Sequence, residues 1–410
     1  MTANRWPSER LKHIADVAFS SVDKKSVDGE VPVRLCNYTD VYYADEITAD
    51  MPFMEATASL DQVRAFGLRA GDVLITKDSE TADDIGVAAF VPERLDGVVC
   101  GYHLAVLRPK QDRVDPKYLF WSMASAYARE QMSVVASGVT RYGLRFGDVG
   151  NLRLLIPELD RQRAAARFLD RETARIDSLL KKKQALAAAI DVQMVTYITK
   201  MTERQEWSPI RLKYLLRERI TDGPHETPEF EDEGVPFLSV DSVQDGRLVF
   251  DGCRYISPEA NREYGRKCRP EKGDLLLTKA ASIGKVAEVA TDRVFAVWSP
   301  LALLKPDPSK ASTRFLFFAL QGRTAQEQMV LASTSNTQNN LSMPDIGRLK
   351  VQLPPLKEQA RIARVLMGQW ARRAQLLARL SASYKILSQR RQALVTSVVT
   401  GQIDVPAETA

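Results

Sequence analysis

Several features that would place this chain in a common functional class are scarce or missing. No stretch of about 20 apolar residues is present, and residues 1–7 contain no apolar signal core, so neither a membrane-spanning nor a secreted protein is expected. The four cysteines include no Cys-x-x-Cys pair: Cys36, Cys100, Cys253 and Cys268. Neither a zinc site nor a disulfide framework is therefore expected, and the chain is predicted to be cytoplasmic.

The motifs of nucleic-acid enzymes are also missing. The chain has no Asn-Pro-Pro or Asp-Pro-Pro of a methyltransferase, no Gly-x-x-x-x-Gly-Lys-Ser/Thr phosphate loop, and no Glu-x-Lys of a metal-dependent nuclease. Its three histidines form no metal-binding pair. We expect His103 to be a hydrogen-bonded core residue and His225 to order a turn, although DNA contact by His225 is also open. The sequence therefore predicts no catalytic residue, no metal and no cofactor bound by this chain.

Positive charge is unevenly distributed. The formal net charge is only +5, but residues 158–204 and 358–400 together carry an excess of +10, which leaves −5 for the rest of the chain. A polyanion-binding protein concentrates positive potential on its binding face. Because the excess lies on two helical segments, it supports nucleic-acid binding only weakly, and solvated helix faces explain it equally well.

The chain consists of two similar halves. Residues 70–77, Ala-Gly-Asp-Val-Leu-Ile-Thr-Lys, return at 272–279 as Lys-Gly-Asp-Leu-Leu-Leu-Thr-Lys. Residues 156–169 and 353–366 share six identities, at Pro, Leu, Gln, Ala, Arg and Leu. Random pairing of fourteen positions would give about one identity. Because several motifs recur in the same order, the sequence indicates a tandem duplication with a unit of about 200 residues.

Each half has the same predicted plan, an α/β globular part followed by one long helix. Short strands are expected at 72–76, 98–107, 274–278 and 294–304, with helical stretches around 116–132 and 313–331. The predicted boundaries are 1–157 for the first globular domain, 158–205 for the first helix, 206–355 for the second domain, 356–402 for the second helix and 403–410 for a tail. Proline marks both helix entries, where a first turn tolerates it.

The long helices carry apolar residues at spacings of three, four and seven, which are typical of a helix–helix seam. The stripes are Leu169, Ile176, Leu179, Leu186, Ile190, Met194 and Ile198, and Ile362, Leu366, Leu376, Leu380, Leu387, Leu394 and Val398. At 1.5 Å per residue each helix spans about 65 Å, or about 19 base pairs at ~3.4 Å each. An antiparallel pair would relate the two domains by a pseudo-two-fold axis and set the spacing of two DNA half-sites. Divergence between the halves predicts two different half-sequences.

These features together resemble the specificity subunit of a Type I restriction–modification system. The resemblance rests on the duplicated plan, the Pro-x-Leu-x-x-Gln helix entries, the Gly-Asp-Val/Leu-Leu strands, the Leu-Asp-Arg-Glu-Thr-Ala-Arg-Ile-Asp run at 169–177 and the segment 390–403. It implies two target-recognition domains that read a bipartite, asymmetric site in double-stranded DNA. It implies a coiled-coil spacer that docks two methyltransferase subunits, which carry S-adenosylmethionine and methylate adenine. Separate restriction (motor–nuclease) subunits would use ATP and Mg²⁺.

The predicted DNA contacts lie in two pairs of loops. The loop at 137–145 and its counterpart at 333–340 offer Arg for guanine, Asn or Gln for adenine, and small polar residues for phosphates. The ends of the two Gly-Asp strands offer lysines as phosphate ligands, although a solvated strand end is equally expected. The predicted contact residues are Thr76, Lys77, Gly138, Thr140, Arg141, Tyr142, Arg145, Thr278, Lys279, Ser282, Ser335, Asn336, Thr337, Gln338, Asn339 and Asn340.

Other residues leave alternatives open. Tyr42, Tyr43 and Trp298 could contact DNA, but burial is the stronger expectation. The first unit also has four extra residues between its Gly-Asp strand and the next glycine, including an acidic stretch at 78–84, which puts base contacts there in doubt. The helix arginines Arg372, Arg373, Arg390 and Arg391 could neutralise spacer phosphates or pair with acidic partner helices.

Two rival functions remain. A coiled-coil assembly scaffold whose globular units bind proteins would select no DNA sequence even with its partners present. A self-contained nuclease or methyltransferase would be active as the isolated chain, which the missing motifs argue against.

Overall fold

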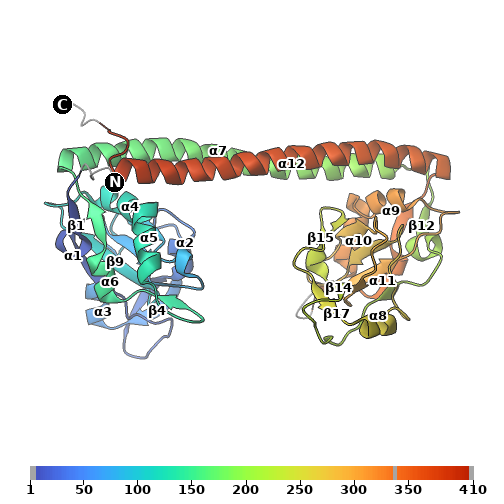
Figure 1. Cartoon of the computed structure of the whole chain (residues 1–410), viewed down its shortest axis with the longest axis horizontal. Coiled ribbons are helices and arrows are strands. Elements are labelled where there is room, and N and C mark those ends of the chain that lie inside the picture. The colour runs from blue at the N-terminus through green and yellow to red at the C-terminus, as the bar shows by residue number, and fades with distance from the viewer. Residues whose placement is uncertain (1–5, 336–338, 406–410) are drawn as a thin grey trace. The chain divides into compact units, whose positions relative to one another are not determined.

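The computed structural model describes residues 6–335 and 339–405, which form two compact units (Figure 1). The unit bounds are Met1–Lys183 with Ala382–Ala410 for unit 1, and Gln184–Ser381 for unit 2. Helix α7 (Leu159–Thr202) and helix α12 (Leu356–Val399) are each 44 residues long, and each unit contains a stretch of both. The remainder of each unit is a mixture of strands and short helices, so the prediction of a mixed α/β fold is confirmed.

Unit 1 contains a four-stranded sheet of order β2-β9-β5-β7, a three-stranded sheet of order β4-β3-β8, and the pairs β1-β11 and β10-β6. Its strands are β1 Ser8–Arg10, β2 Ala15–Phe19, β3 Val31–Cys36, β4 Met54–Ala58, β5 Val73–Thr76, β6 Asp78–Ser79, β7 Ala88–Phe90, β8 Val98–Cys100, β9 Leu104–Pro109, β10 Tyr142–Gly143 and β11 Arg153–Leu155. Its short helices are α1 Leu11–Ile14, α2 Tyr38–Tyr42, α3 Leu60–Phe66, η1 Ala82–Asp84, α4 Pro116–Ala124, α5 Ala126–Val135 and α6 Phe146–Asn151.

Unit 2 contains a four-stranded sheet of order β13-β21-β18-β19, a three-stranded sheet of order β17-β14-β20, and the pairs β12-β24, β15-β16 and β22-β23. Its strands are β12 Pro209–Arg211, β13 Thr221–Asp222, β14 Val235–Leu238, β15 Val243–Gln244, β16 Arg247–Leu248, β17 Arg254–Ile256, β18 Leu275–Thr278, β19 Val286–Glu288, β20 Ala296–Val297, β21 Leu301–Leu304, β22 Thr334–Ser335, β23 Asn339–Asn340 and β24 Lys350–Gln352. Its short helices are η2 Leu212–Leu215, η3 Val240–Ser242, α8 Pro258–Tyr264, α9 Thr313–Ala319, α10 Arg323–Ala332 and α11 Met343–Arg348.

The two units share one topology. Strands β2-β9-β5-β7 of unit 1 correspond in order and direction to β13-β21-β18-β19 of unit 2, and β4-β3-β8 corresponds to β17-β14-β20. In each three-stranded sheet the last pair is parallel, β3 with β8 and β14 with β20, while the other pairings of these sheets are antiparallel. The sequence repeats therefore describe one fold that occurs twice.

Two predicted strands are each divided in the structure. Residues 98–107 form β8 and β9, which belong to different sheets, and residues 294–304 contain β20 and β21 in the same way. A tight turn separates each pair, closed by Leu104 N–H to the Gly101 carbonyl (3.0 Å) and by Leu301 N–H to the Trp298 carbonyl (2.9 Å). The two predicted helical stretches are likewise divided, into α4 and α5 and into α9 and α10. Apolar runs cannot show where a chain passes from one sheet to another.

The repeated Gly-Asp motif starts a central strand of each four-stranded sheet. Gly71 and Gly273 have φ of +87° and +94°, which L-residues rarely adopt. Asp72 and Asp274 are buried, and each carboxylate accepts the backbone N–H three residues earlier, at 2.9 and 2.8 Å. Burial raises the pKa of both carboxyls. The motif therefore builds a tight turn into a buried strand, which is a structural role.

The glutamine of the Pro-x-Leu-x-x-Gln motif joins each long helix to its globular part. Gln162 and Gln359 are buried. Their Oε1 atoms accept the backbone N–H of Asp115 and Ser312, the residues that precede α4 and α9, both at 2.8 Å. Their Nε2 groups donate to two backbone carbonyls each, at 3.2 and 2.7 Å in unit 1 and 3.2 and 2.9 Å in unit 2. The same residue therefore makes the same three bonds in both units.

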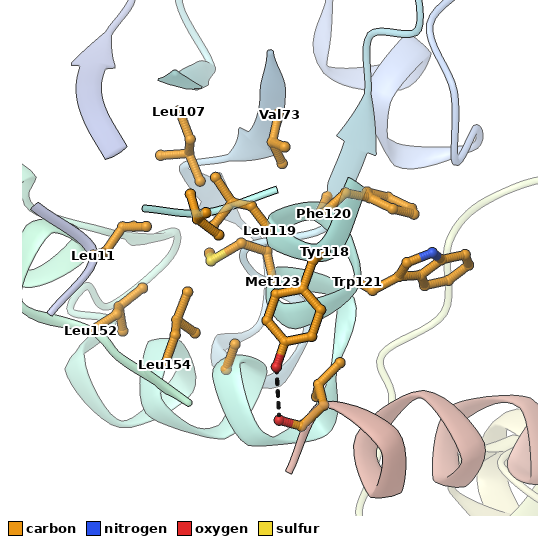
Figure 2. Packing of buried hydrophobic residues seen from close by; sticks show 14 of the residues in the cluster. Leu11, Val73, Leu107, Tyr118, Leu119, Phe120, Trp121, Met123, Leu152 and Leu154 are labelled. Carbon is orange, nitrogen blue, oxygen red and sulfur yellow. Dashed lines mark hydrogen bonds between the residues drawn. The ribbon is translucent and has the colours of Figure 1, made fainter. Parts of the chain in front are cut away.

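The core of unit 1 lies around α4, whose side chains pack against the sheet and the long helices (Figure 2). Tyr118, Leu119, Phe120 and Met123 are fully or almost fully buried. The Tyr118 hydroxyl lies 2.8 Å from the Leu155 carbonyl oxygen and 3.3 Å from that of Val399 at the end of α12. In unit 2, Phe315, Leu316 and Phe318 of α9 take the corresponding position and pack with Ile362 and Leu366 of α12. The long helices are thus part of each unit's core.

The apolar stripes of the long helices are buried only in part. In α7, Leu169, Ile176, Met194 and Ile198 are buried, and in α12 so are Ile362, Leu366 and Val398. Leu179, Leu186 and Leu376, nearer the middle of the helices, are each about half exposed. The globular parts therefore cover the ends of each stripe, while the central apolar side chains stay accessible.

Candidate nucleic-acid interface

In unit 1, two separately predicted segments form one surface. Strand β10 pairs with β6, and Leu144 N–H donates to the Lys77 carbonyl at 2.8 Å. Ser137 and Gly143 exchange two backbone hydrogen bonds of 3.1 and 3.0 Å, which close the loop between them. A Cβ on Gly138 would lie 1.9 Å from the Arg141 carbonyl oxygen, so the loop requires glycine there. The strand end at Lys77 and the loop at 137–145 are therefore adjacent.

Arg141 is an exposed cation of this surface whose guanidinium is held in place. Its side chain is 55% exposed, and its Nη2 donates to Asp78 Oδ1 at 2.5 Å. The other oxygen of Asp78 lies 2.8 Å from His103 Nδ1. Asp78 therefore orients the guanidinium and the imidazole together, a positioning role that the acidic stretch did not indicate in the sequence. His103 is hydrogen-bonded as expected, but it lies half-buried in the turn after β8, not in the core.

Lys77 and Thr76 have different roles. The Lys77 ammonium lies 4.1 Å from the centroid of the Tyr102 ring and 5.3 Å from that of Phe19, and burial lowers the pKa of this lysine. It stays half-exposed at the surface. Thr76 is fully buried, and its hydroxyl accepts the Val87 N–H at 3.0 Å, so it supports the strand and cannot face a ligand.

Three tyrosine rings lie beside this surface, of which Tyr43 is exposed and Tyr38 and Tyr42 are half-buried. Tyr38 and Tyr42 stack with centroids 5.4 Å apart, and Tyr43 stands edge-on to Tyr42 at 4.9 Å. Tyr43 is 81% exposed, so its expected burial is wrong, because the short helix α2 has only one face against the sheet. The Tyr42 hydroxyl donates to Asp84 Oδ2 at 2.6 Å, and this bond, with burial, raises the pKa of Tyr42 to about 12. Exposed rings of this kind can stack on bases or sugars.

The other predicted contacts of the first loop occupy its exposed rim. Gly138, Thr140 and Arg145 are exposed, whereas Tyr142 is half-buried where β10 pairs with β6. The loop thus offers one guanidinium held by Asp78, a second at Arg145, and the exposed residues Gly138 and Thr140.

Unit 2 repeats the backbone arrangement with other side chains. Leu341 N–H donates to the Lys279 carbonyl at 2.8 Å, as Leu144 does to Lys77, and Ala280 bridges to Asn340. Ser335 belongs to strand β22 and Asn339 to strand β23, and Asn340 is exposed. Asn336, Thr337 and Gln338 lie outside the described residues. The two predicted segments of this unit are therefore also adjacent.

Lys279 and Thr278 differ from their predicted roles. Lys279 is only 7% exposed, and its ammonium lies 3.5 Å from Asp222 Oδ2. Asp222 is buried and also accepts Lys267 Nζ at 2.6 Å, while His225 Nε2 lies 3.1 Å from it. Thr278 is fully buried, with its hydroxyl bonded to the Ser282 carbonyl and the Lys285 N–H. Lys279 is drawn inward by its ion pair with Asp222 of β13, and Thr278 by its two backbone hydrogen bonds, which no local pattern reveals.

An aromatic group lies next to this turn. Trp298 is half-buried, its ring centroid 6.0 Å from Phe237 and 6.5 Å from Phe230, and Ser299 N–H donates to the Pro224 carbonyl at 3.2 Å. The rings line a cavity of about 360 Å³, which also contains Arg254 with its guanidinium 4.5 Å from the Phe230 centroid. The expected burial of Trp298 is thus only partly met.

Two of the four helix arginines hold the globular parts to the helices. In unit 1, Arg391 of α12 donates to Asp177 of α7 at 2.9 Å and also pairs with Asp45 of the globular part. In unit 2, Arg373 of α12 donates to Asp191 of α7 at 2.8 Å and also pairs with Asp245 in the β15–β16 turn. Their side chains are only 20% and 14% exposed. Neither a spacer phosphate nor a partner helix is needed to explain these two residues.

Residues 6–335 and 339–405 contain neither a cluster of metal ligands nor a membrane-spanning helix. No group of three or more His, Cys, Asp or Glu side chains there could hold a metal ion. No helix in the same residues is long and apolar enough to cross a membrane.

Comparison with known proteins gives a consistent result. The family model described as the Type I restriction modification DNA specificity domain matches residues 12–188 and 220–368. The chain is 25% identical over 316 residues to the type I restriction enzyme StySPI specificity subunit of Salmonella potsdam, covering 72% of this chain and 66% of that protein. It is 23% identical over 281 residues to the EcoBI specificity subunit of Escherichia coli, covering 62% of this chain and 59% of that protein.

One solved structure resembles the whole fold. It concerns complex assembly and conformational transition of the type I R-M system, and it has 20% sequence identity and a TM-score of 0.70. The match covers 97% of this chain and 98% of that chain, so the likeness extends over both units and supports the fold described above.

Proposed function

Because the chain belongs to the family of Type I restriction modification DNA specificity proteins, in which both halves match the same domain, we propose that each unit reads one half of a bipartite DNA site. The observation that carries this proposal is the repeated loop pairing. In unit 1 the hydrogen bond from Leu144 N–H to the Lys77 carbonyl joins the two predicted loops. In unit 2 the bond from Leu341 N–H to the Lys279 carbonyl joins the equivalent two loops.

The side chains on the repeated framework differ, which supports an asymmetric site. Unit 1 offers Arg141, Lys77 and the exposed Tyr43, whereas the sequence of the corresponding loop in unit 2 contains asparagines and serines, of which Asn340 is exposed. Guanidinium groups suit guanine and carboxamides suit adenine, so two such surfaces recognise different sequences. The proposed contact set is Lys77, Gly138, Thr140, Arg141, Tyr142, Arg145, Ser282, Ser335, Asn336, Thr337, Gln338, Asn339 and Asn340. Thr76, Thr278 and Lys279 are left out because they are buried.

We infer that α7 and α12 pair as an antiparallel coiled coil with pseudo-two-fold symmetry and act as a ruler for the spacer. The ion pairs within each unit support this inference, because α7 supplies the carboxylates Asp177 and Asp191 and α12 supplies the cations Arg391 and Arg373. Complementary charges of this kind favour pairing of the two different helices over pairing of like with like.

We further infer that the chain is non-catalytic and docks two methyltransferase subunits through the long helices. The half-exposed Leu179, Leu186 and Leu376 give these helices an apolar surface of the kind a partner helix covers. S-adenosylmethionine would then belong to the methyltransferase subunits, and ATP and Mg²⁺ to the restriction subunits. The complex would act on host and foreign DNA in the cytoplasm.

The test is genome-wide mapping of methylated adenines in cells that express the partner subunits, with and without this chain. Loss of one split motif with a fixed gap is expected when the chain is absent. Arg141→Gln should relax one position of one half-site, with about 1–3 kcal/mol less discrimination there, and leave the other half unchanged. Arg64→Gln, an exposed arginine on α3 of the same unit, serves as the matched control.

The scaffold alternative predicts a different outcome. If no motif disappears while the partner subunits are present and assembled, this chain does not select DNA, and binding of proteins by the globular units becomes the better hypothesis.

A further inference from the structure

Unit 2 contains a cavity of about 580 Å³ whose wall is rich in cations. It lies between the end of α8, the segment leading into β18, and the connection from β19 to β20. The cationic side chains of its wall are Arg262, Arg266, Arg269, Lys272 and Arg293. The acidic residues of the wall are Glu271 and Asp292. Cations therefore outnumber carboxylates around this cavity.

Both carboxylates already have cationic partners. Asp292 Oδ2 lies 2.7 Å from Lys272 Nζ, and Glu271 Oε2 accepts Lys305 Nζ at 2.9 Å and Arg217 Nη2 at 3.1 Å. In contrast, Arg266, Arg269 and Arg293 form no ion pair with any residue that the structure describes. Three exposed arginines without an ion pair therefore line one cavity, and the charge of Arg269 also acts on Glu271. Such an excess of cations attracts an anion.

Two side chains of the cavity wall are buried, Cys268 and Phe295. Phe250, which is not part of the wall, packs edge-on against Phe295 with centroids 5.6 Å apart. The Arg293 guanidinium lies 4.7 Å from the Phe250 ring centroid, a cation–π contact that restricts its side chain. A restrained guanidinium reduces the entropy lost when a ligand binds.

Unit 1 provides an internal comparison. Helix α3 corresponds to α8, since each follows a capping serine and ends at a glycine, Gly67 and Gly265. From that glycine to the Gly-Asp motif, unit 2 has four more residues than unit 1, and the longer segment contains Arg266, Lys267 and Arg269. The excess of cations is thus an addition to the shared fold of the second unit, not a requirement of that fold.

The cavity and the loop that begins at Lys279 lie at opposite ends of β18, although Lys267 of the cavity segment and Lys279 both pair with Asp222. The cavity segment precedes Leu275, the first residue of β18, whereas the loop that begins at Lys279 follows its last residue. At about 3.3 Å per residue the strand separates them by roughly 13 Å. Within unit 2, α8 also lies on the side away from α12 (Figure 1).

We propose that this cavity binds phosphate groups of the DNA backbone just outside the second half-site. Arginine forks match phosphate oxygens bidentately, and such contacts position a protein on DNA without reading sequence. In the proposed function, on which this inference rests, the loop at Lys279 reads the half-site, so phosphates that meet the opposite end of β18 lie outside the bases that it reads. The second unit thereby gains affinity that its carboxamide-rich loops do not provide.

The test uses the complete complex with its methyltransferase subunits and a labelled duplex that contains the mapped site. Arg266→Gln/Arg269→Gln should reduce the slope of log K against log salt by about 2, at ~0.9 per lost phosphate contact, while the methylated motif stays the same. The matched control is Arg64→Gln/Arg94→Gln on exposed arginines of unit 1, which should leave the slope unchanged. Arg266→Lys/Arg269→Lys should restore most of the slope, which separates a charge effect from a folding defect.

A second duplex, trimmed at the outer edge of the second half-site, locates the contact. On this duplex the slope of log K against log salt for the wild-type complex should fall by the same amount. The double variant should then show the same slope as the wild type. An unchanged slope in the variant on full-length DNA, with the wild type still selecting the site, would overturn this inference and leave the proposed function intact. Failure of the wild type to select any site would instead refute the proposed function.

A free phosphate source is tested separately with pyrophosphate and ATP at constant ionic strength. Neither compound should displace the full-length duplex at concentrations at which the trimmed duplex stays bound. Binding of ATP that the double variant abolishes, together with no effect of trimming, would assign the cavity to a nucleotide and contradict the DNA assignment.

Discussion

At the residue scale, a few buried polar side chains hold the repeated motifs together. Gln162 satisfies the Asp115 N–H and the carbonyls of Arg113 and Pro157, and Gln359 makes the equivalent three bonds in unit 2. A glutamine at this helix position looks like any surface residue in the sequence, because nothing local shows that it is buried. Its recurrence at the same place in both halves was the available signal.

Replacing Gln162 with leucine should destabilise this junction by about 3 kcal/mol, because it leaves a buried N–H and two carbonyls without partners at about 1–3 kcal/mol each, partly offset by apolar burial. Hydrogen exchange of the α4 amides measures this local loss. Gln193→Leu, on an exposed residue of the same helix, should change exchange in its surroundings by less than about 0.5 kcal/mol. Equal loss of α4 protection in both variants would contradict the anchoring role.

Tyr42 gives a prediction about pH. The hydrogen bond to Asp84 raises its pKa from 10 to about 12 in the folded chain. Because the folded-state value lies above the unfolded value, the stabilisation is complete below pH 10 and is lost as pH rises from 10 to about 12. An ultraviolet titration should show a late tyrosinate step that Tyr42→Phe removes and Asp84→Asn moves to lower pH. Tyr43→Phe should keep this step, and its loss there would refute the assignment.

At the element scale, arginines on α12 connect helices to globular parts. Arg373 joins α7 to the β15–β16 turn, where Asp245 and Gly246 both have positive φ and a Cβ on Gly246 would lie 2.6 Å from the Phe317 ring. The turn can therefore lie directly against α9 and α12. Arg391 does the same for Asp45 in unit 1. These ion pairs fix the globular part of each unit to the stretches of α7 and α12 that belong to the same unit.

Arg373→Met should loosen the second unit on its helices without changing either half-site. Removing a largely buried cation leaves Asp191 and Asp245 unpaired, so exchange in the β15–β16 turn should accelerate at least ten-fold, equivalent to about 1.4 kcal/mol. Methylation mapping should then show activity at spacers one base pair longer and shorter. The neighbouring exposed Arg372→Met is the control, and the same two changes in that variant would argue against the clamp.

At the scale of the whole molecule, the unit boundaries permit a test of the ruler. Four residues inserted after Lys183 and four before Ala382 fall at the points where the chain passes between units, so the contacts within each unit stay intact. Four helical residues add about 6 Å, close to two base pairs. We expect the methylated site to keep both half-sequences and to gain about two base pairs of spacer.

The control for this experiment inserts the same four residues in a loop of unit 1, at the exposed turn around Gly29, where a Cβ would have free space. That variant should keep the original spacer. Altered half-site bases in the helix-insertion variant would show that the helices do more than set distance.

Some properties of this protein follow from the sequence alone. The duplication, the mixed α/β fold and the presence of two long helices are visible because repeats and helical periodicity are local or nearly local patterns. The two loops of each unit were also identifiable as polar segments at equivalent positions. Their adjacency was not, since it depends on backbone pairing between segments about 60 residues apart.

Tertiary structure alone decided which of those residues face solvent. Thr76 and Lys279 resemble surface residues at strand ends, yet Thr76 is buried with its hydroxyl bonded to the Val87 N–H, and Lys279 turns inward to Asp222. Arg391 reaches Asp45, which is more than 300 positions away in the chain. Burial and ion pairing depend on which distant segments meet, and a sequence pattern records only a residue's neighbours along the chain.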